Sequence, residues 1–227
     1  MNSFITLIFL GIILAGFSQE PKATEKEALM WVTVSNMEGV PLVGEKIEVE
    51  AASTKIIVSA ITNDKGKCWF LLKKGETFDI RYKEIEKSRD YQKIQIPNEE
   101  GLFEVEAIIM YEPAKSYTLE NVYFDTGKAT LKPSSFVALD ELVDFMKRKK
   151  STIIEIGGHT DNVGDDNANL TLSQQRAESV KNYLLKNGIE ESRVQAKGYG
   201  ETKFIAPNDS EENRQKNRRT EVTILSN

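Results

Sequence analysis

The stretch Gly157-Gly-His-Thr-Asp-Asn-Val-Gly164, followed by Asn169-Leu-Thr-Leu-Ser-Gln-Gln-Arg-Ala177, is the most informative part of the chain. An apolar run before it predicts a strand, and the apolar spacing after it predicts a helix. Asp161 therefore lies in a loop after a strand, and Arg176 lies inside the following helix. A guanidinium offers a planar fork of donors to a carboxylate, and an aspartate accepts from an ammonium. Together the two side chains could grip a zwitterion.

The helix after the loop has a polar arc and an apolar arc. At about 100° per residue, Asn169, Ser173 and Arg176 share one narrow arc. The adjoining arc should face the sheet, and it carries Leu170, Ala177, Val180 and Leu184. Arg176 stands at the border, where its stem can pack while its head remains free to bind. The start of the helix also supplies unpaired N–H groups, which favour an anionic ligand group.

These motifs, in this order and spacing, resemble the OmpA-like peptidoglycan-binding domain over roughly residues 117–225. The segments that carry the resemblance are Val122–Leu131 with Lys132-Pro133, Gly158–Asp161 with Gly164, Asn169–Ala177, Gly188-Ile189, Arg193, Gly198–Glu201, Asn208 and Asn217-Arg218-Arg219. The resemblance implies that Asp161 and Arg176 hold the meso-diaminopimelate of the peptidoglycan stem peptide. It implies supporting roles for Thr160, Asn169, Leu172, Ser173 and Arg219. One of Arg218 and Arg219 should be structural and the other near the ligand.

Other interpretations of the same residues remain open or are weak. Asp161 and Arg176 could pair with each other and brace the loop. The acidic segment 161–172 departs from an EF-hand loop at its sixth and twelfth positions, so we expect no calcium site. His159 is the only histidine, which disfavours zinc. A serine hydrolase built on Ser173 lacks the Gly-x-Ser-x-Gly elbow. We therefore expect no metal, no cofactor and no catalytic residue.

The N-terminal half reads as short strands separated by Gly, Asn, Asp and Pro turns. The expected strands are 31–34, 47–50, 55–62, 67–72, 77–82, 91–96 and 103–110. This spacing predicts an antiparallel β-sandwich. The turn segments Gly39–Gly44, Thr62–Gly66 and Lys74–Ile80 resemble the carboxypeptidase-regulatory-like or transthyretin-like sandwich. That resemblance implies a spacer or interaction module and names no ligand.

The C-terminal half alternates strand and helix patterns. We expect strands at 118–124, 152–156, 194–198 and 219–225, and helices at 134–146, 167–186 and 211–216. The fold class is therefore α+β with two domains, in which the second is an α/β sandwich with helices on one face of a mixed sheet. The expected boundaries are a β-sandwich at 30–111, a linker at 112–117 and the OmpA-like domain at 118–227.

The N-terminus indicates the compartment. The apolar run Phe4–Phe17 precedes a polar segment, which is typical of a signal peptide at residues 1–18 followed by a leader at 19–29. An uncleaved membrane anchor is the alternative. Cys68 is the only cysteine, so no intramolecular disulfide can form, and its aromatic neighbours suggest an inert thiol. The net charge of −5 disfavours a nucleic-acid partner.

The apolar N-terminus predicts an exported protein, and the OmpA-like resemblance implies a non-enzymatic anchor that binds peptidoglycan. By the setting usual for the resembled family, it would work in the periplasm, peripheral to the outer membrane at most. An alternative is an envelope scaffold whose β-sandwich recruits a protein partner in secretion or motility, with the OmpA-like domain serving only for positioning. A peptidoglycan-processing enzyme is a second alternative.

Overall fold

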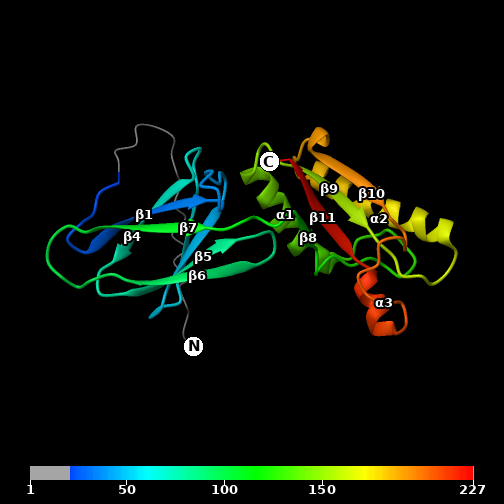
Figure 1. The fold of residues 1–227 in the computed structure, drawn as a ribbon, viewed down its shortest axis with the longest axis horizontal. Helices are drawn as coiled ribbons and strands as arrows, with labels where there is room; N and C mark the ends of the chain where they lie inside the picture. The colour runs from blue at the N-terminus through cyan, green and yellow to red at the C-terminus, as the bar shows by residue number, and fades with distance from the viewer. Residues whose placement is uncertain (1–20, 227) are drawn as a thin grey trace, which may run out of the picture.

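The computed structural model describes residues 21–226, and the expected signal peptide or anchor lies outside these residues. The fold is α+β and has two lobes. One lobe consists of two β-sheets, and the other consists of one sheet covered by helices (Figure 1). All peptide bonds in the described residues are trans.

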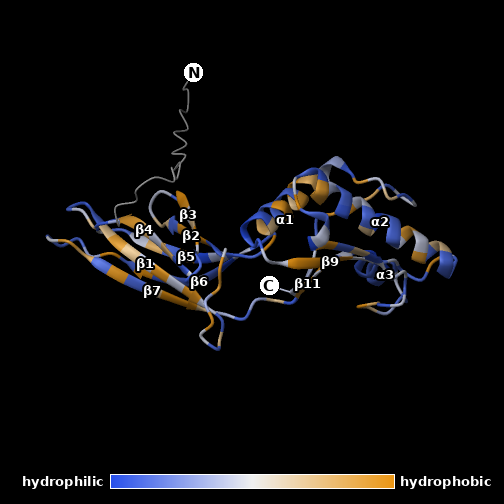
Figure 2. Ribbon diagram, turned by 90° about the horizontal axis from the view of Figure 1, so that it is seen from above, coloured by the Kyte–Doolittle hydropathy of each residue, from blue (hydrophilic) through white to orange (hydrophobic). Residues whose placement is uncertain are grey.

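The N-terminal lobe contains seven strands in two sheets. They are β1 (Glu27–Ser35), β2 (Lys46–Ala51), β3 (Ile57–Ile61), β4 (Lys67–Lys73), β5 (Thr77–Lys83), β6 (Ser88–Gln95) and β7 (Glu104–Met110). One sheet has the order β4-β1-β7 and the other β3-β2-β5-β6. Most of these strands alternate buried and more exposed residues, most cleanly β4, whereas β3 and β6 are largely exposed. The buried residues of the two sheets form one core cluster. The hydropathy colouring shows this alternation along β1 and β7 (Figure 2).

The expectation of an entirely antiparallel arrangement was wrong for one pair of strands. β1 pairs antiparallel with β4 but parallel with β7, with Leu29 opposite Glu104 and Ser35 opposite Met110. The period-two pattern of a strand is the same in either direction, so the sequence could not distinguish a parallel from an antiparallel neighbour.

The C-terminal lobe is a mixed four-stranded sheet with helices. Its sheet has the order β10-β9-β11-β8, in which β9 and β10 are parallel and β11 is antiparallel to both β9 and β8. The strands are β8 (Ser116–Thr118), β9 (Ile153–Gly158), β10 (Val194–Gly198) and β11 (Thr220–Ser226). The α-helices are α1 (Phe136–Arg148), α2 (Asp166–Lys186) and α3 (Glu211–Asn217), and 3-10 turns lie at Pro133–Ser135 and Glu191–Arg193.

Two sequence expectations in this lobe were wrong in detail. The strand expected at 118–124 is instead β8 at Ser116–Thr118, which overlaps the end of the expected linker, and it is followed by an isolated bridge between Phe124 and Leu131. β8 pairs with β11, a strand far from it in the sequence, and local sequence patterns do not predict such a pairing. Leu170, expected to face the sheet, is 48% exposed because it lies in the first turns of α2, beyond the end of the sheet.

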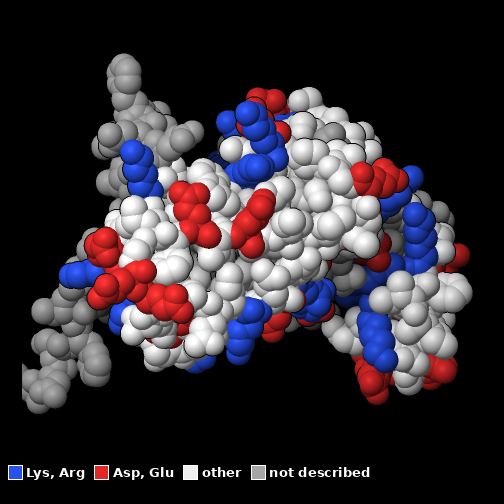
Figure 3. Space-filling model, turned by 60° about the vertical axis from the view of Figure 1, so that its left-hand side comes forward, with Lys and Arg blue, Asp and Glu red and all other residues white. Residues whose placement is uncertain are grey.

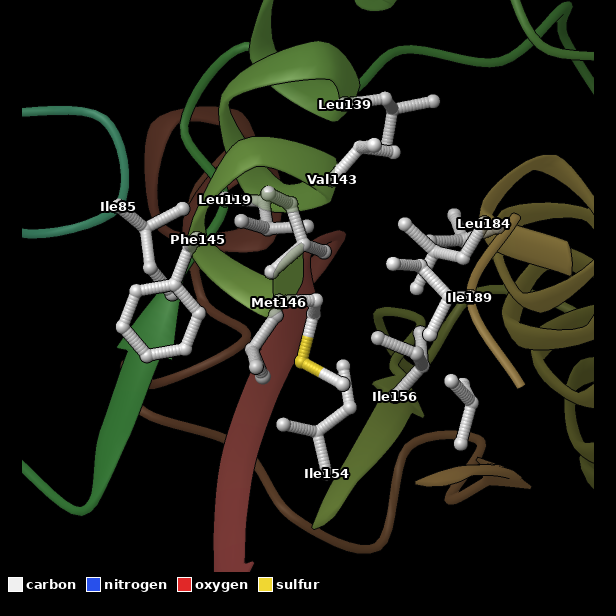
Figure 4. Packing of buried hydrophobic residues seen from close by; sticks show 14 of the residues in the cluster. Ile85, Leu119, Leu139, Val143, Phe145, Met146, Ile154, Ile156, Leu184 and Ile189 are labelled. Carbon is white, nitrogen blue, oxygen red and sulfur yellow. The ribbon is translucent and has the colours of Figure 1, made fainter. Parts of the chain in front are cut away.

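The two lobes meet through a packed and charged contact. Ile85, from the turn between β5 and β6, is 2% exposed and belongs to the core cluster of the C-terminal lobe, where it lies beside Phe145 of α1 (Figure 4). At the end of α1, the Lys149 ammonium contacts the buried Glu45 carboxylate, and Arg148 Nη1 donates to Gly44 O at 2.7 Å. The lobes are therefore joined by buried contacts as well as by the chain.

The surface carries charges of both signs, and the thiol of Cys68 is buried. The face shown in Figure 3 carries charged side chains of both signs, lysine and arginine as well as aspartate and glutamate. Cys68 is buried, and burial raises the pKa of its thiol to about 12, so it is protonated near neutral pH.

Among residues 21–226, no helix is long and apolar enough to cross a membrane. Within the same range, no group of three or more His, Cys, Asp or Glu side chains is placed to hold a metal ion.

Candidate ligand-binding site around Asp161 and Arg176

Close contact between α2 and the sheet positions the candidate site. A Cβ built on Gly158, at the end of β9, would lie 2.2 Å from Ser173 O, and one built on Gly198 would lie 2.4 Å from Gln174 N. Only glycine permits this approach, because the obstructing atoms belong to the helix backbone. The helix thereby passes directly over the strand end from which Asp161 emerges.

The start of α2 is tied to the same loop. Asp165 is the N-cap residue, and its side chain accepts from Ala168 N at 2.9 Å. Asn169 is 8% exposed, and its Nδ2 donates to Asp161 O, Val163 O and Glu201 Oε2 at 3.1–3.3 Å. Asn169 is thus a brace for the loop backbone rather than a free ligand group.

Asp161 is 7% exposed, and it is partnered on both carboxylate oxygens. Oδ1 accepts from Val163 N at 3.0 Å, and Oδ2 forms an ion pair with Arg218 Nη1. Arg218 also contacts Glu211 Oε1 of α3 at 2.5 Å. A carboxylate has about four lone-pair positions, so Asp161 retains acceptor capacity for an additional donor.

Arg176 is half-buried and is held by groups other than Asp161. Its Nε donates to Lys128 O at 3.1 Å, and its guanidinium carbon lies 5.1 Å from the centre of the Phe124 ring. Within residues 21–226, no carboxylate lies within ion-pairing distance of Arg176. Burial and the neighbouring Arg218 lower the pKa of Arg176, while Asp161 opposes that shift. The direct Asp161–Arg176 pair considered from the sequence is therefore not formed.

Arg219, expected as a supporting residue, lies elsewhere, and Arg218 takes the position beside Asp161. Arg219 Nε donates to Glu221 Oε1 at 2.7 Å and Nη2 donates to Lys203 O at 3.0 Å. Its side chain is 6% exposed. Of the two arginines, Arg218 is therefore the one that contacts Asp161, and a role of Arg219 in ligand binding stays a prediction.

The remaining expected residues are near the site, but two of them are closed to solvent. Ser173 is fully buried, because its Oγ donates to Leu170 O at 2.8 Å and accepts from Gly200 N at 2.9 Å. Thr160 is 4% exposed and donates its N–H to Gly200 O. Leu172 lines an open depression of about 470 Å³ whose other lining residues are Gly127, Asn167, Ala168, Asn169, Thr171 and Gln175. This depression lies between the start of α2 and the loop whose Lys128 O accepts a hydrogen bond from Arg176.

No sequence pattern indicated which residues orient Arg176. Phe124 and the backbone of Lys128 belong to the turn before α1, far from α2 in the chain. Their positions depend on the bridge between Phe124 and Leu131, which folds that turn back on itself.

Buried His159 predicts a pH-dependent stability for this loop. It is 1% exposed, stacks on Tyr199 with ring centres 5.1 Å apart, and has Nε2 3.4 Å from Glu221 Oε2, without good hydrogen-bond geometry for either ring nitrogen within residues 21–226. Burial, with Arg219 second, lowers the pKa of His159 from 6.5 to about 4. Between these two pKa values the unfolded chain binds a proton more readily than the folded chain does. The contribution of His159 to the free energy of unfolding is therefore fully present above about pH 6.5 and is lost as the pH falls toward 4, by at most about 3 kcal/mol.

The variant His159→Phe isolates this effect, because it keeps a stacked ring but has no proton to bind. Chemical denaturation at several pH values should show a smaller loss of unfolding free energy between pH 6.5 and 4 in the variant than in the wild type. Equal slopes in the two proteins would mean that His159 is not the group responsible.

Residues 123–218, within the C-terminal lobe, match the model of the OmpA family. Outer membrane porin F of Pseudomonas fluorescens is 43% identical over 104 residues, which are 46% of this chain and 32% of that protein. The probable lipoprotein YiaD of Escherichia coli K12 is 38% identical over 104 residues, which are 46% of this chain and 48% of that protein.

A solved structure is also similar to part of the chain. The peptidoglycan-associated lipoprotein of Burkholderia pseudomallei is 28% identical, with a TM-score of 0.44, and the match covers 49% of this chain and 91% of that one. The chain spans less than half the length of each of the two relatives described above.

Proposed function

We propose that the chain is a non-enzymatic anchor of the cell envelope that binds peptidoglycan through its C-terminal lobe. Asp161 and Arg176 would hold the diaminopimelate of the stem peptide. The observation that supports this most directly is the state of Arg176. Its Nε is fixed by Lys128 O and its face by Phe124, but no carboxylate within residues 21–226 pairs with it.

The charges around the site favour a zwitterion. Arg176 and Arg218 present two guanidinium groups, of which Arg218 is balanced by Asp161 and Glu211. A ligand carboxylate would pair with Arg176, and the adjacent ammonium would share the Asp161 carboxylate with Arg218. Diaminopimelate carries both groups on one carbon. A stem peptide with lysine in the same position lacks that carboxylate and would leave Arg176 unmatched.

The relatives agree with an envelope location. One is named as an outer membrane porin and another as a probable lipoprotein. A contact with a charged group contributes roughly 1.5–3 kcal/mol. Two such contacts would give affinity on the order of micromolar to millimolar for one stem peptide. Because peptidoglycan repeats that peptide, several weakly bound copies would hold by avidity.

Binding to sacculi tests the proposal. Residues 19–227 should pellet with diaminopimelate-type sacculi, whereas Asp161→Asn and Arg176→Gln should each lose affinity about tenfold or more. Arg89→Gln is the matched control, because Arg89 is an exposed arginine of the N-terminal lobe that pairs with Glu84. This variant should bind as the wild type does. Circular dichroism checks that each variant is folded.

Two comparison arms make the test specific. Lysine-type sacculi should retain less wild-type protein than diaminopimelate-type sacculi. Release of muropeptides from either preparation would contradict the non-enzymatic assignment. If Asp161→Asn, Arg176→Gln and Arg89→Gln all pellet like the wild type, the site does not bind peptidoglycan, and Asp161 serves only to hold Arg218.

A further inference from the structure

The edge strand β3 is unusually apolar and exposed. It borders its sheet, and among the described residues it pairs only with β2 (Figure 2). Its side chains remain open to solvent, with Ile57 51%, Val58 45% and Ile61 44% exposed. Unpaired, hydrophobic edge strands are templates for pairing with another chain, and proteins usually protect them with charges or proline. β3 has the sequence IVSAI and carries neither.

The other sheet borders are protected in this way. The free border strand β6 contains Arg89, Asp90 and Lys93, and β4 begins and ends with lysine. β7 carries Glu104 and Glu106. Of the borders of the two N-terminal sheets described here, β3 alone has no charged side chain within the strand.

The register with β2 shows which backbone groups of β3 are free. Ala51 N donates to Ile56 O at 3.0 Å, and Thr62 N donates to Glu45 O at 2.9 Å. Hydrogen-bonded pairs alternate along an antiparallel ladder, so Val58 and Ala60 bond to β2 between these two pairs. The N–H and C=O groups of Ile57, Ser59 and Ile61 therefore point away from the sheet.

We propose that β3 pairs with β3 of a second copy of this chain, antiparallel and two-fold symmetric about Ser59. In that register Ser59 faces Ser59 of the other copy, and Ile57 faces Ile61 in both directions. All three residues with outward backbone groups then meet outward groups, which gives roughly six interchain hydrogen bonds. The two four-stranded sheets become one continuous sheet.

Side chains and charges fit this pairing. A two-fold axis brings identical residues together, so any charge at the centre of the strand would face its own copy, and β3 has none. Ile57 and Ile61 form β-branched cross-strand pairs on the outer face. Beyond the strand, the same register places Lys55 opposite Asn63 of the other copy, next to its Asp64. The Lys55 ammonium pairs with Glu50 at 3.3 Å, and with 69% of its side chain exposed it would have to leave or share Glu50 to reach Asp64 of the other copy.

The contact is small, which determines how it should behave. A strand border buries less than the standard interface of about 1,600 Å². Association should therefore be reversible, with a dissociation constant on the order of micromolar. The inference does not depend on the proposed ligand site, which lies in the other lobe, so either can fail without the other.

Cysteine cross-linking tests the register. Residues in a hydrogen-bonded antiparallel pair have Cα atoms about 5.5 Å apart, within the range of about 4.4–6.8 Å that a disulfide spans. Ser59→Cys should therefore form covalent dimers on mild oxidation. Ile57→Cys alone should not, whereas a mixture of Ile57→Cys and Ile61→Cys should form mixed dimers. The native Cys68 is buried and serves as the unreactive background.

Sedimentation velocity of residues 19–227 over a concentration series tests the dimer without modification. Ser59→Lys places two ammonium groups together and should raise the dissociation constant about tenfold or more. Gln92→Lys, on the exposed opposite border strand β6, should leave it unchanged. A wild type that stays monomeric throughout, or Gln92→Cys that cross-links as fast as Ser59→Cys, overturns the proposal. A complex with a different protein at β3 that excludes self-association overturns it as well.

Discussion

Gly158→Ala is expected to destabilise the C-terminal lobe by about 3 kcal/mol, at the upper end of the usual range for overpacking. The added Cβ would lie 2.2 Å from Ser173 O and 2.9 Å from Ser173 C. These are backbone atoms in the middle of a 21-residue helix, so no side-chain rotation relieves the contact. Either α2 moves away from β9 or the strand bends. Denaturant unfolding monitored by circular dichroism measures the loss.

Gly157→Ala is the matched control, because it adds the same methyl group one residue earlier on the opposite face of β9. Its nearest neighbours are side-chain atoms, His159 Nε2 at 3.2 Å and Tyr199 at 3.4 Å, and these can shift by a few tenths of an ångström. We expect a loss below about 1 kcal/mol there. Equal losses for the two variants would show that strand flexibility, rather than contact with the helix backbone, determines the cost.

The same substitution connects packing to the proposed function. Arg176 lies one turn after Ser173, whereas Asp161 follows Gly158 in the loop, so a displaced helix changes the distance between the two charged groups. Folded Gly158→Ala protein should therefore bind sacculi more weakly than Gly157→Ala does under the same conditions.

Local pattern was sufficient to predict most elements of the fold. The amphipathic spacing over α2 predicted its limits to within a residue, and β10 was predicted at 194–198 as observed. The start and end of α2 are marked by local chemistry, with Asp165 at the N-cap and Gly188 after the last turn. Where pairing partners decided the outcome, as for β8 and the parallel β1–β7 pair, the sequence alone was insufficient.

The candidate site shows the same division. Asp161 and Arg176 were placed near one another from motif spacing, because a loop and the helix after it are neighbours in any fold. Which arginine reaches Asp161 was not predictable. That choice depends on β11 starting at Thr220 and on α3 ending at Asn217, which leaves Arg218 in the connection that crosses the site. The orientation of Ser173 into the sheet also follows from contact with Gly200 rather than from helix periodicity.

Ile85 belongs by its position in the chain to the expected β-sandwich at 30–111, but it packs in the core of the C-terminal lobe. The residue comes from the turn between β5 and β6 but is 2% exposed among side chains of the C-terminal core, next to Phe145 (Figure 4). Around this contact, Lys83 pairs with Glu141 at 3.4 Å and Glu120 N donates to Glu86 Oε2 at 3.0 Å. A lobe separated from its neighbour would expose the apolar surface that Ile85 covers.

Ile85→Ala is therefore expected to lower the free energy of unfolding by about 2–4 kcal/mol. The effect should fall on the C-terminal lobe, although the substitution lies outside that lobe. The reason is the cavity that the lost side-chain atoms would leave beside Phe145, in a cluster of buried residues. Hydrogen–deuterium exchange should become faster in α1 and β8 than in β1 and β7. Ile108→Ala, at a 55% exposed isoleucine of the N-terminal lobe, should change stability by less than about 0.5 kcal/mol. Faster exchange confined to β5 and β6 would mean that the lobes unfold independently. Faster exchange in α1 would mean that the N-terminal lobe completes the core of the domain that carries the candidate site, so that deleting residues 21–111 would weaken sacculus binding through stability alone.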